Sequence, residues 1–145
     1  MIVYLDASAL VKRYVVEAES AQVVALIGGA QMTGTAVLCR AEVAAALAKA
    51  VRVGLVSREA ALKALGAFNA DWEYLIRLHF GEPLAARAAM LAWEHGLRGY
   101  DAVHLATALA WRETLGEAVT VATYDRELWR GALAAGLSPW PAGNG

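Results

Sequence analysis

The N-terminal segment most constrains the fold, because four apolar residues in a row, Ile2 to Leu5, run directly into the carboxylate of Asp6. Such a run, rich in β-branched and aromatic residues, is typical of a strand buried on both faces, as in a parallel sheet covered by helices. Open sheets of this kind bind ligands outside the carboxyl ends of their strands. We therefore expect further carboxylates to gather around Asp6 and to hold a divalent metal together with it. Ser8 would add a hydroxyl there or begin the next helix.

Length and hydropathy indicate one domain. With 145 residues and 59% hydrophobic content, the chain can bury a single core and is too short for two domains. We expect that domain to span residues 1–141 and to leave a tail at 142–145. No apolar stretch approaches the roughly 20 residues that cross a bilayer, and the N-terminus lacks the basic start of a signal peptide. A cytoplasmic protein without membrane contact is expected.

Cysteine content and charge limit the chemistry. The single cysteine, Cys39, excludes an internal disulfide and a cysteine metal cluster, and its apolar surroundings indicate a core thiol. A bound metal would therefore need oxygen ligands. The net charge of −1 gives no broad attraction for nucleic acid, so RNA or DNA binding would need a local basic patch or metal ions that bridge to phosphate.

Strand patterns alternate with helical patterns along the chain. Buried strands are expected at 2–5, 31–33, 75–79 and 119–123. Helices are expected at 9–30 (one or two), 37–53, 59–70, 83–96, 102–113 and 124–135, with Thr35 and Ser57 as N-caps and residues 138–141 as a tail. This alternation predicts an α/β fold, a three-layer α/β/α sandwich around a short, mainly parallel sheet. The strand order is left open.

Three of the four aspartates, Asp6, Asp101 and Asp125, lie at a strand end or a helix start beside apolar runs, where a charge is costly unless it is paired or bound to metal. Taken singly, Asp101 and Asp125 are as well explained as plain helix caps. Taken together, Asp6 and Asp125 both follow buried strands, so a parallel sheet would bring them to the same edge. Glu42, in an alanine-rich helix, is a fourth candidate, with a solvated surface glutamate as the alternative.

These residues carry a resemblance to a known family. The sequence resembles the PIN-domain ribonucleases, and within them the VapC toxins of toxin-antitoxin pairs, from Ile2 to about Pro139. The matching segments are Tyr4-Leu5-Asp6-Ala7-Ser8, Glu42, the run from Leu97 to Ala108 that contains Gly99-Tyr100-Asp101, and Val121-Ala122-Thr123-Tyr124-Asp125. The resemblance implies a PIN-like fold, a cognate VapB-type antitoxin, and a catalytic metal site formed by Asp6, Glu42, Asp101 and Asp125 with support from Thr123.

Carboxylate ligands favour Mg²⁺ or Mn²⁺, which keep several waters and bridge to substrate phosphate. Such an ion lowers the pKa of a bound water and neutralises phosphate charge. We expect Asp6 and Asp101 to be the main ligands and Asp125 to bind directly or through water. Glu42 would be a ligand or a base. Whether one or two ions act is left open.

Several other side chains could serve an RNA substrate. Cations close to the acidic motifs in sequence are candidate RNA contacts, with plain surface charges as the alternative for each: Lys12, Arg13, Arg40 and Arg98. His104, one helical turn after Asp101, would either touch the site or be a hydrogen-bonded core histidine. Three tryptophans on helical apolar patterns are predicted to pack rather than to stack bases: Trp93, Trp111 and Trp129.

The leading hypothesis is therefore a metal-dependent endoribonuclease that cuts single-stranded or loop RNA as the toxin of a toxin-antitoxin pair. The helix pair from Val37 to Ala70 has enough apolar surface for a homodimer contact or an antitoxin groove, or simply packs on its own core. The alternatives are a stand-alone RNA-processing nuclease and a non-catalytic PIN-like interaction protein that uses its acids as caps. A phosphoaspartate enzyme or receiver domain is disfavoured, because Ser8 replaces its second acid and Thr123-Tyr124 replaces its lysine.

Overall fold

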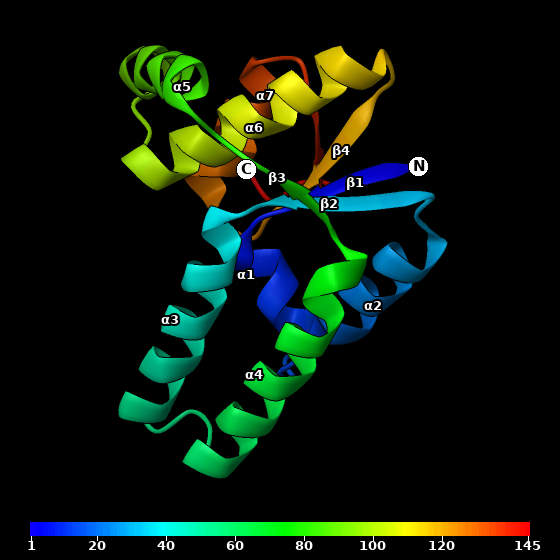
Figure 1. Ribbon diagram of the computed structural model, residues 1–145, viewed down its shortest axis with the longest axis vertical. Coiled ribbons are helices and arrows are strands. Elements are labelled where there is room, and N and C mark those ends of the chain that lie inside the picture. The colour runs from blue at the N-terminus through cyan, green and yellow to red at the C-terminus, as the bar shows by residue number, and fades with distance from the viewer.

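A parallel sheet of five strands forms the middle layer of the computed structural model, which describes residues 1–145 (Figure 1). The strands lie in the order β3-β2-β1-β4-β5, and every neighbouring pair is parallel. Their bounds are β1 Ile2–Leu5, β2 Met32–Ala36, β3 Ile76–Leu78, β4 Val119–Ala122 and β5 Ser138–Trp140. All five carboxyl ends therefore meet at one edge of the sheet, as the sequence predicted.

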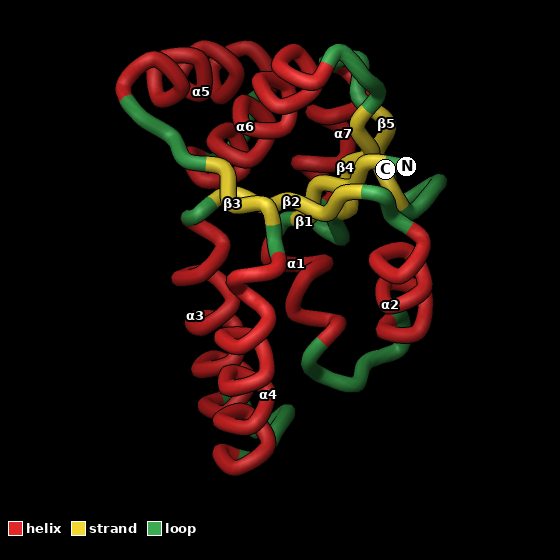
Figure 2. Tube along the Cα trace, turned by 45° about the vertical axis from the view of Figure 1, so that its right-hand side comes forward, coloured by secondary structure: helices red, strands yellow, loops and turns green.

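Helices cover both faces of the sheet (Figures 1 and 2). One layer contains α1 Ala7–Leu10, α2 Ser20–Gly29, α3 Leu38–Arg52 and α4 Arg58–Asp71, with the short 3₁₀ helices η1 Val11–Arg13 and η2 Trp72–Tyr74. The other contains α5 Glu82–His95, α6 Gly99–Leu115 and α7 Arg126–Ala134. The predicted three-layer α/β/α architecture is confirmed. No helix is both long and apolar enough to cross a membrane.

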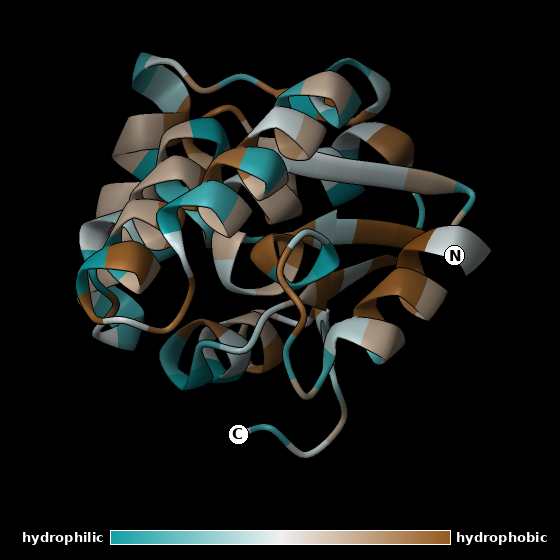
Figure 3. Cartoon of the chain, turned by 90° about the horizontal axis from the view of Figure 1, so that it is seen from below, coloured by the Kyte–Doolittle hydropathy of each residue, from teal (hydrophilic) through white to brown (hydrophobic).

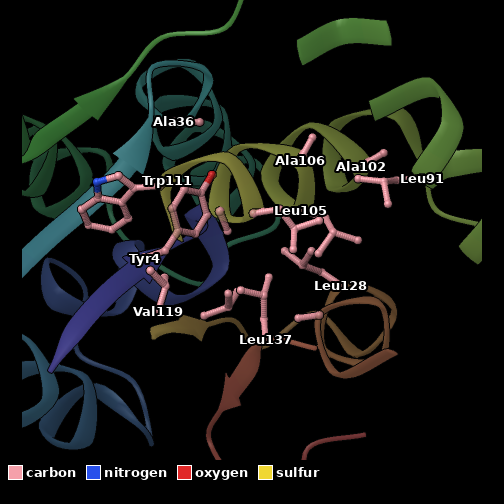
Figure 4. Close-up of a cluster of buried hydrophobic side chains, with 14 of the residues drawn as sticks. Tyr4, Ala36, Leu91, Ala102, Leu105, Ala106, Trp111, Val119, Leu128 and Leu137 are labelled. Atoms are coloured by element: carbon pink, nitrogen blue, oxygen red, sulfur yellow. The ribbon is translucent and has the colours of Figure 1, made fainter. Parts of the chain in front are cut away.

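Strand β1 joins two hydrophobic cores. Its side chains alternate, so that Val3 and Leu5 pack under α1 to α4, whereas Ile2 and Tyr4 pack under α5 to α7 (Figure 4). All four are buried, which explains the unbroken apolar run. Hydrophobic and hydrophilic residues alternate along the covering helices (Figure 3), as expected for amphipathic helices that pack on a sheet. Cys39 is buried in the first core, and burial raises the pKa of its thiol.

The structure corrects three details of the sequence interpretation in the C-terminal half of the chain, from α5 to β5. Residues 138–140, expected as part of a tail, form edge strand β5, where Pro139 is tolerated because an edge needs fewer backbone donors. Trp93 was predicted to pack, but it is 92% exposed because it lies on the outer face of α5, away from Ala88 and Leu91. Helix α6 begins at Gly99 rather than at residue 102.

Thr35 was also assigned wrongly. It was predicted to cap the helix that follows, but it lies within β2, which extends to Ala36, and its Oγ1 donates to the carbonyl of Leu5 at 2.7 Å. Helix α3 begins after Val37 without a side-chain cap. Other boundaries were predicted well: Ser57 caps α4, and Gly96 ends α5 in the left-handed conformation.

Gly34 in β2 and Gly66 in α4 allow a matched test of the packing. A Cβ built on Gly34 would lie 2.7 Å from Trp111 on α6, whereas nothing lies within 4 Å of a Cβ on Gly66. Gly34→Ala should lower the free energy of unfolding by about 1–3 kcal/mol through overpacking. Gly66→Ala should raise it by about 0.5–1 kcal/mol because alanine is the better helix former. Urea denaturation measures both, and equal effects of the two substitutions would contradict this packing.

Candidate active site

The pairing of β1 with β4 sets the position of the candidate site. Leu5 lies opposite Ala122, and the backbone N–H of Asp6 donates to the Ala122 carbonyl at 3.3 Å. Asp6 therefore leaves the sheet beside Thr123, two residues before Asp125. This is the shared edge that the sequence predicted for Asp6 and Asp125.

Asp6 lies at the centre of a hydroxyl network. Its Oδ1 accepts hydrogen bonds from Ser8 Oγ at 2.7 Å and from the backbone N–H of Ala9 at 3.0 Å, and its Oδ2 accepts from Thr123 Oγ1 at 2.7 Å. The N–H of Asp125 in turn donates to Thr123 Oγ1 at 3.0 Å. Both hydroxyl residues named from the sequence thus contact Asp6 directly and limit its rotation.

Burial leaves the charge of Asp6 poorly compensated. Loss of solvent raises the pKa of this carboxyl, although the charge of His104 and the hydrogen bonds from Thr123, Ser8 and Ala9 act in the opposite direction. A cation close to Asp6 would therefore be favoured.

Asp101 is also buried, in the first turn of α6. The sequence allowed it to be a plain helix cap, but the N-cap position belongs to Arg98, and no backbone N–H donates to the Asp101 side chain. Its hydrogen bond comes from Arg98 Nε at 3.0 Å. Burial and the negative charge of Asp125 raise the pKa of Asp101 to about 6, against the lowering effect of Arg98. Asp101 is thus a second buried acid whose negative charge is not fully offset by nearby positive charge.

Asp125 is both a helix cap and a neighbour of the other acids. Its Oδ1 accepts from the backbone N–H groups of Glu127 and Leu128 at 2.9 and 3.1 Å, which caps α7. Its Oδ2 accepts from the guanidinium of Arg98. Arg98 therefore bridges Asp125 and Asp101, and the Oδ2 atom is the part of Asp125 that is free of the cap.

Glu42 approaches the site from α3. Its side chain is 22% exposed, and its Oε1 lies 2.5 Å from Nε2 of His104. The other ring nitrogen of His104, Nδ1, lies 2.6 Å from the hydroxyl of Tyr4. Both alternatives raised for His104 therefore hold, since it is a hydrogen-bonded core residue and it contacts a site acid.

The four acids line one cleft of about 620 Å³ at the carboxyl edge of the sheet. Among the polar side chains of its wall, Lys49 and Tyr100 were not predicted as site residues, although Tyr100 lies in the motif around Asp101. Lys49 follows Glu42 by seven residues, so helical spacing could have placed it on the same face of α3. Arg98 lies over the Tyr100 ring, 5.0 Å from its centroid.

The remaining basic candidates lie in other contacts. Lys12 Nζ pairs with Glu17 at 2.5 Å and with Glu19 at 3.0 Å. Arg13 Nε lies 3.8 Å from Asp71. Arg40 lies over the ring of Trp72, 5.7 Å from its centroid. Of the four cations named from the sequence, Arg98 is the one that bonds to the site acids.

The cleft fits a hard divalent ion in the chemistry of its donors. Its ligands would be carboxylate oxygens, and the buried pair Asp6 and Asp101 gains from added positive charge. Four acids line the cleft, and two cations offset their negative charge: Lys49 in the cleft wall and Arg98, which is bonded to Asp101. However, no three His, Cys, Asp or Glu side chains lie close enough together to form a preformed metal site. In this structure the acids therefore do not form a complete ligand set, and Arg98 is bonded to oxygens of Asp101 and Asp125.

Comparisons with known proteins found a matching family model and two curated relatives. The PIN domain family model matches residues 3–132. Ribonuclease VapC45 of Mycobacterium tuberculosis (strain CDC 1551 / Oshkosh) is 37% identical over 142 residues, which cover 97% of this chain and 96% of the relative. Ribonuclease VapC49 of Mycobacterium tuberculosis (strain ATCC 25618 / H37Rv) has the same identity and coverage.

Solved structures share the fold. PAE2754 from Pyrobaculum aerophilum has a TM-score of 0.66 at 24% identity, over 96% of this chain and 83% of that one. A toxin-antitoxin complex from Klebsiella pneumoniae has a TM-score of 0.63 at 18% identity, over 89% of this chain and 91% of that one. At these identities the likeness shows the fold alone.

The buried charge of Asp101 leads to a stability prediction. Because the pKa of Asp101 is raised in the folded state, its protonation stabilises the fold at low pH, and this contribution is lost as the pH rises through about 6. In EDTA at pH 8, Asp101→Asn should therefore have a free energy of unfolding roughly 1–3 kcal/mol higher than that of wild type. The difference should disappear near pH 4. Urea denaturation at both pH values measures it, with the exposed substitution Glu94→Gln as the control.

Added Mn²⁺ should stabilise wild type relative to Asp101→Asn. Millimolar Mn²⁺ should raise the thermal midpoint of wild type more than that of Asp101→Asn, since binding to the folded state alone stabilises it. A variant that is less stable than wild type at pH 8 in EDTA, or a wild-type midpoint unmoved by Mn²⁺, would contradict this account of the cleft.

Proposed function

The chain belongs to the PIN domain family, and from this membership we propose that it is an endoribonuclease that hydrolyses RNA phosphodiester bonds with Mg²⁺ or Mn²⁺. It would act in the cytoplasm as the toxin of a toxin-antitoxin pair. The observation that carries the proposal is the convergence of four acids, from the β1–α1 junction, α3, α6 and the β4–α7 junction, on one cleft.

Asp6, Asp101 and Asp125 would hold the metal. When bound there, a divalent ion would supply Lewis-acid stabilisation of the phosphate and lower the pKa of a water. Ser8 and Thr123 support this role because their hydroxyls fix both oxygens of Asp6. The capping bonds hold Oδ1 of Asp125, so that Oδ2 would face the ion.

Glu42 would act as the general base. Its Oε1 is held by His104, which leaves Oε2 to accept a proton from the attacking water at the cleft. Glu42 lies on α3, across the cleft from Asp101 on α6. This position suits a base that acts on a water next to the metal ligands.

Basic side chains at the cleft would bind the RNA backbone. Lys49 and Arg98 are the candidates for this role, since Lys49 lines the cleft and Arg98 bonds to two of its acids, from which a bound metal would release it. Lys12, Arg13 and Arg40 have less support, because each is already paired with an acid or an aromatic ring.

Asp6→Asn and Asp71→Asn form a matched test of the proposed reaction. Asp6 lies in the cleft. Asp71, the last residue of α4, lies outside the cleft and pairs with Tyr14 and Arg13. Asp6→Asn should lose about 100-fold or more of the cleavage rate of a single-stranded RNA in Mg²⁺, because several kcal/mol of charge stabilisation depend on the ion. Asp71→Asn should stay within about threefold of wild type, a difference below 1 kcal/mol. Cleavage that persists in EDTA, or in Asp6→Asn, would contradict the proposal.

We also propose that an antitoxin peptide binds in the apolar groove beside the cleft. The groove, about 390 Å³, lies between α3 and residues 11–17, and it shares Val11, Ala46 and Lys49 with the acidic cleft. Val16 and Leu55 at its wall are 97% and 78% exposed. A peptide in this groove would reach the acids directly. The Klebsiella pneumoniae structure with the same fold is a toxin-antitoxin complex, which supports a partner of this kind.

The homodimer expected from the sequence is a separate proposal. Met90 and Trp93 of α5 lie on the opposite layer from the groove, and both are exposed. They offer an apolar surface that a second copy could cover without blocking an antitoxin.

Leu55→Asp and Leu133→Asp separate the antitoxin groove from general surface apolarity. Leu55 lines the groove, whereas Leu133 is an exposed residue of α7. The cognate VapB-type antitoxin should inhibit RNA cleavage by wild type and by Leu133→Asp. It should bind Leu55→Asp at least about tenfold more weakly, since a buried charge in an apolar contact costs more than about 1.4 kcal/mol. Equal inhibition of all three would refute this groove, and inhibition of none would favour a stand-alone nuclease.

A further inference from the structure

A pair of buried polar residues connects the core of the sheet to Glu42. Tyr4 on β1 and His104 on α6 are 0% and 1% exposed. Figure 4 shows Tyr4 beside α6 among apolar side chains that include Leu105 and Trp111. The rings of Tyr4 and His104 meet edge to face, with centroids 5.8 Å apart. Two polar side chains therefore occupy an otherwise apolar core.

The hydrogen bonds of this pair lead from Tyr4 through His104 to Glu42. An ionised carboxylate can only accept, so Nε2 of His104 carries the hydrogen that bonds to Glu42 Oε1 at 2.5 Å. The other ring nitrogen, Nδ1, lies 2.6 Å from the hydroxyl of Tyr4, which can bond to it whether His104 is neutral or charged. Tyr4 thus holds the ring of His104, and His104 orients the carboxylate of Glu42.

Packing alone does not explain this arrangement. Burying a polar group in an apolar core costs free energy unless it is hydrogen-bonded, and a phenylalanine–leucine pair would fill the same space without that requirement. Glu42 has no hydrogen-bond donor other than His104, and its neighbours on α3, Ala41 and Val43, supply none. The orientation of Glu42 at the cleft therefore depends on His104.

We propose that His104 is a positioning residue which, with Tyr4 behind it, fixes one oxygen of Glu42 so that the other faces the cleft. The inference rests on the proposed function, in which Glu42 acts on the attacking water. Nothing in the sequence pattern linked Tyr4, His104 and Glu42, because the three come from a strand and two helices that meet only in the folded chain.

His104→Gln and His104→Leu test the proposal. Glutamine can present an N–H close to the position of Nε2, whereas leucine fills the space without a donor. His104→Leu should lose about 10–100-fold in kcat for RNA cleavage in Mn²⁺, as partners that orient a site group typically do. KM should stay within about twofold. The free energy of unfolding should fall somewhat, because the buried hydroxyl of Tyr4 is left without a partner. His104→Gln should recover most of kcat.

Equal losses in the two variants, or losses that follow stability, would overturn the proposal. If His104→Leu fails to fold, Tyr4→Phe removes only the hydroxyl that contacts Nδ1 of His104, and it should lower kcat by several-fold with unchanged KM.

A spectroscopic readout separates this inference from the proposed function. In ¹⁵N-edited NMR of the whole protein, His104 should carry its proton on Nε2, and Glu42→Ala should make that proton exchange faster with water. The absence of a proton on Nε2, or no change in Glu42→Ala, would overturn the positioning role even in an active nuclease. Conversely, the expected spectrum in a protein that cuts no RNA would retain the His104–Glu42 contact and reject the nuclease assignment.

Discussion

The parallel pairing of β1 with β4 is the constraint on which the site depends. Because Leu5 and Ala122 lie side by side, the residues that follow them leave the sheet together, and Thr123 can hold Asp6 through its hydroxyl. Two short helices begin directly at this edge, so Asp6 and Asp125 are fixed as N-caps as well as neighbours. A change in the register of either strand would separate them. The sheet therefore provides the rigidity that a charged site requires.

Two of the four acids in the cleft, Asp6 and Asp101, are almost fully buried. Burial raises the pKa of both Asp6 and Asp101, which means that the folded chain gives up stability to keep these carboxylates in place. Arg98 offsets part of that cost through its bonds to Asp101 and Asp125. A divalent ion would offset more. Stability and metal binding are consequently linked, with Arg98 and the ion competing for the same oxygens.

The sequence predicted the features that follow from local pattern. The apolar run before Asp6 identified a central strand, and the rule that parallel strands share an edge placed Asp125 beside it. The alanine-rich surroundings of Glu42 made it a candidate, but only the family resemblance favoured the site over a surface position, because helical spacing does not say which helices meet across a sheet. Tyr4 was quoted as part of a motif, but its contact with His104 depends on tertiary packing. Strand β5 was missed because three residues that include a proline carry almost no strand pattern.

The central claim is that the acids at the sheet edge together form one cation-binding site. Anomalous diffraction from crystals grown with Mn²⁺ tests it most directly, since the scattering locates the ion without reference to activity. The account predicts a peak in the cleft, about 2.0–2.2 Å from carboxylate oxygens of Asp6 and Asp101, with Arg98 moved away from Asp101. No peak in the cleft at millimolar Mn²⁺, with Arg98 still bonded to Asp101 and Asp125, would contradict it.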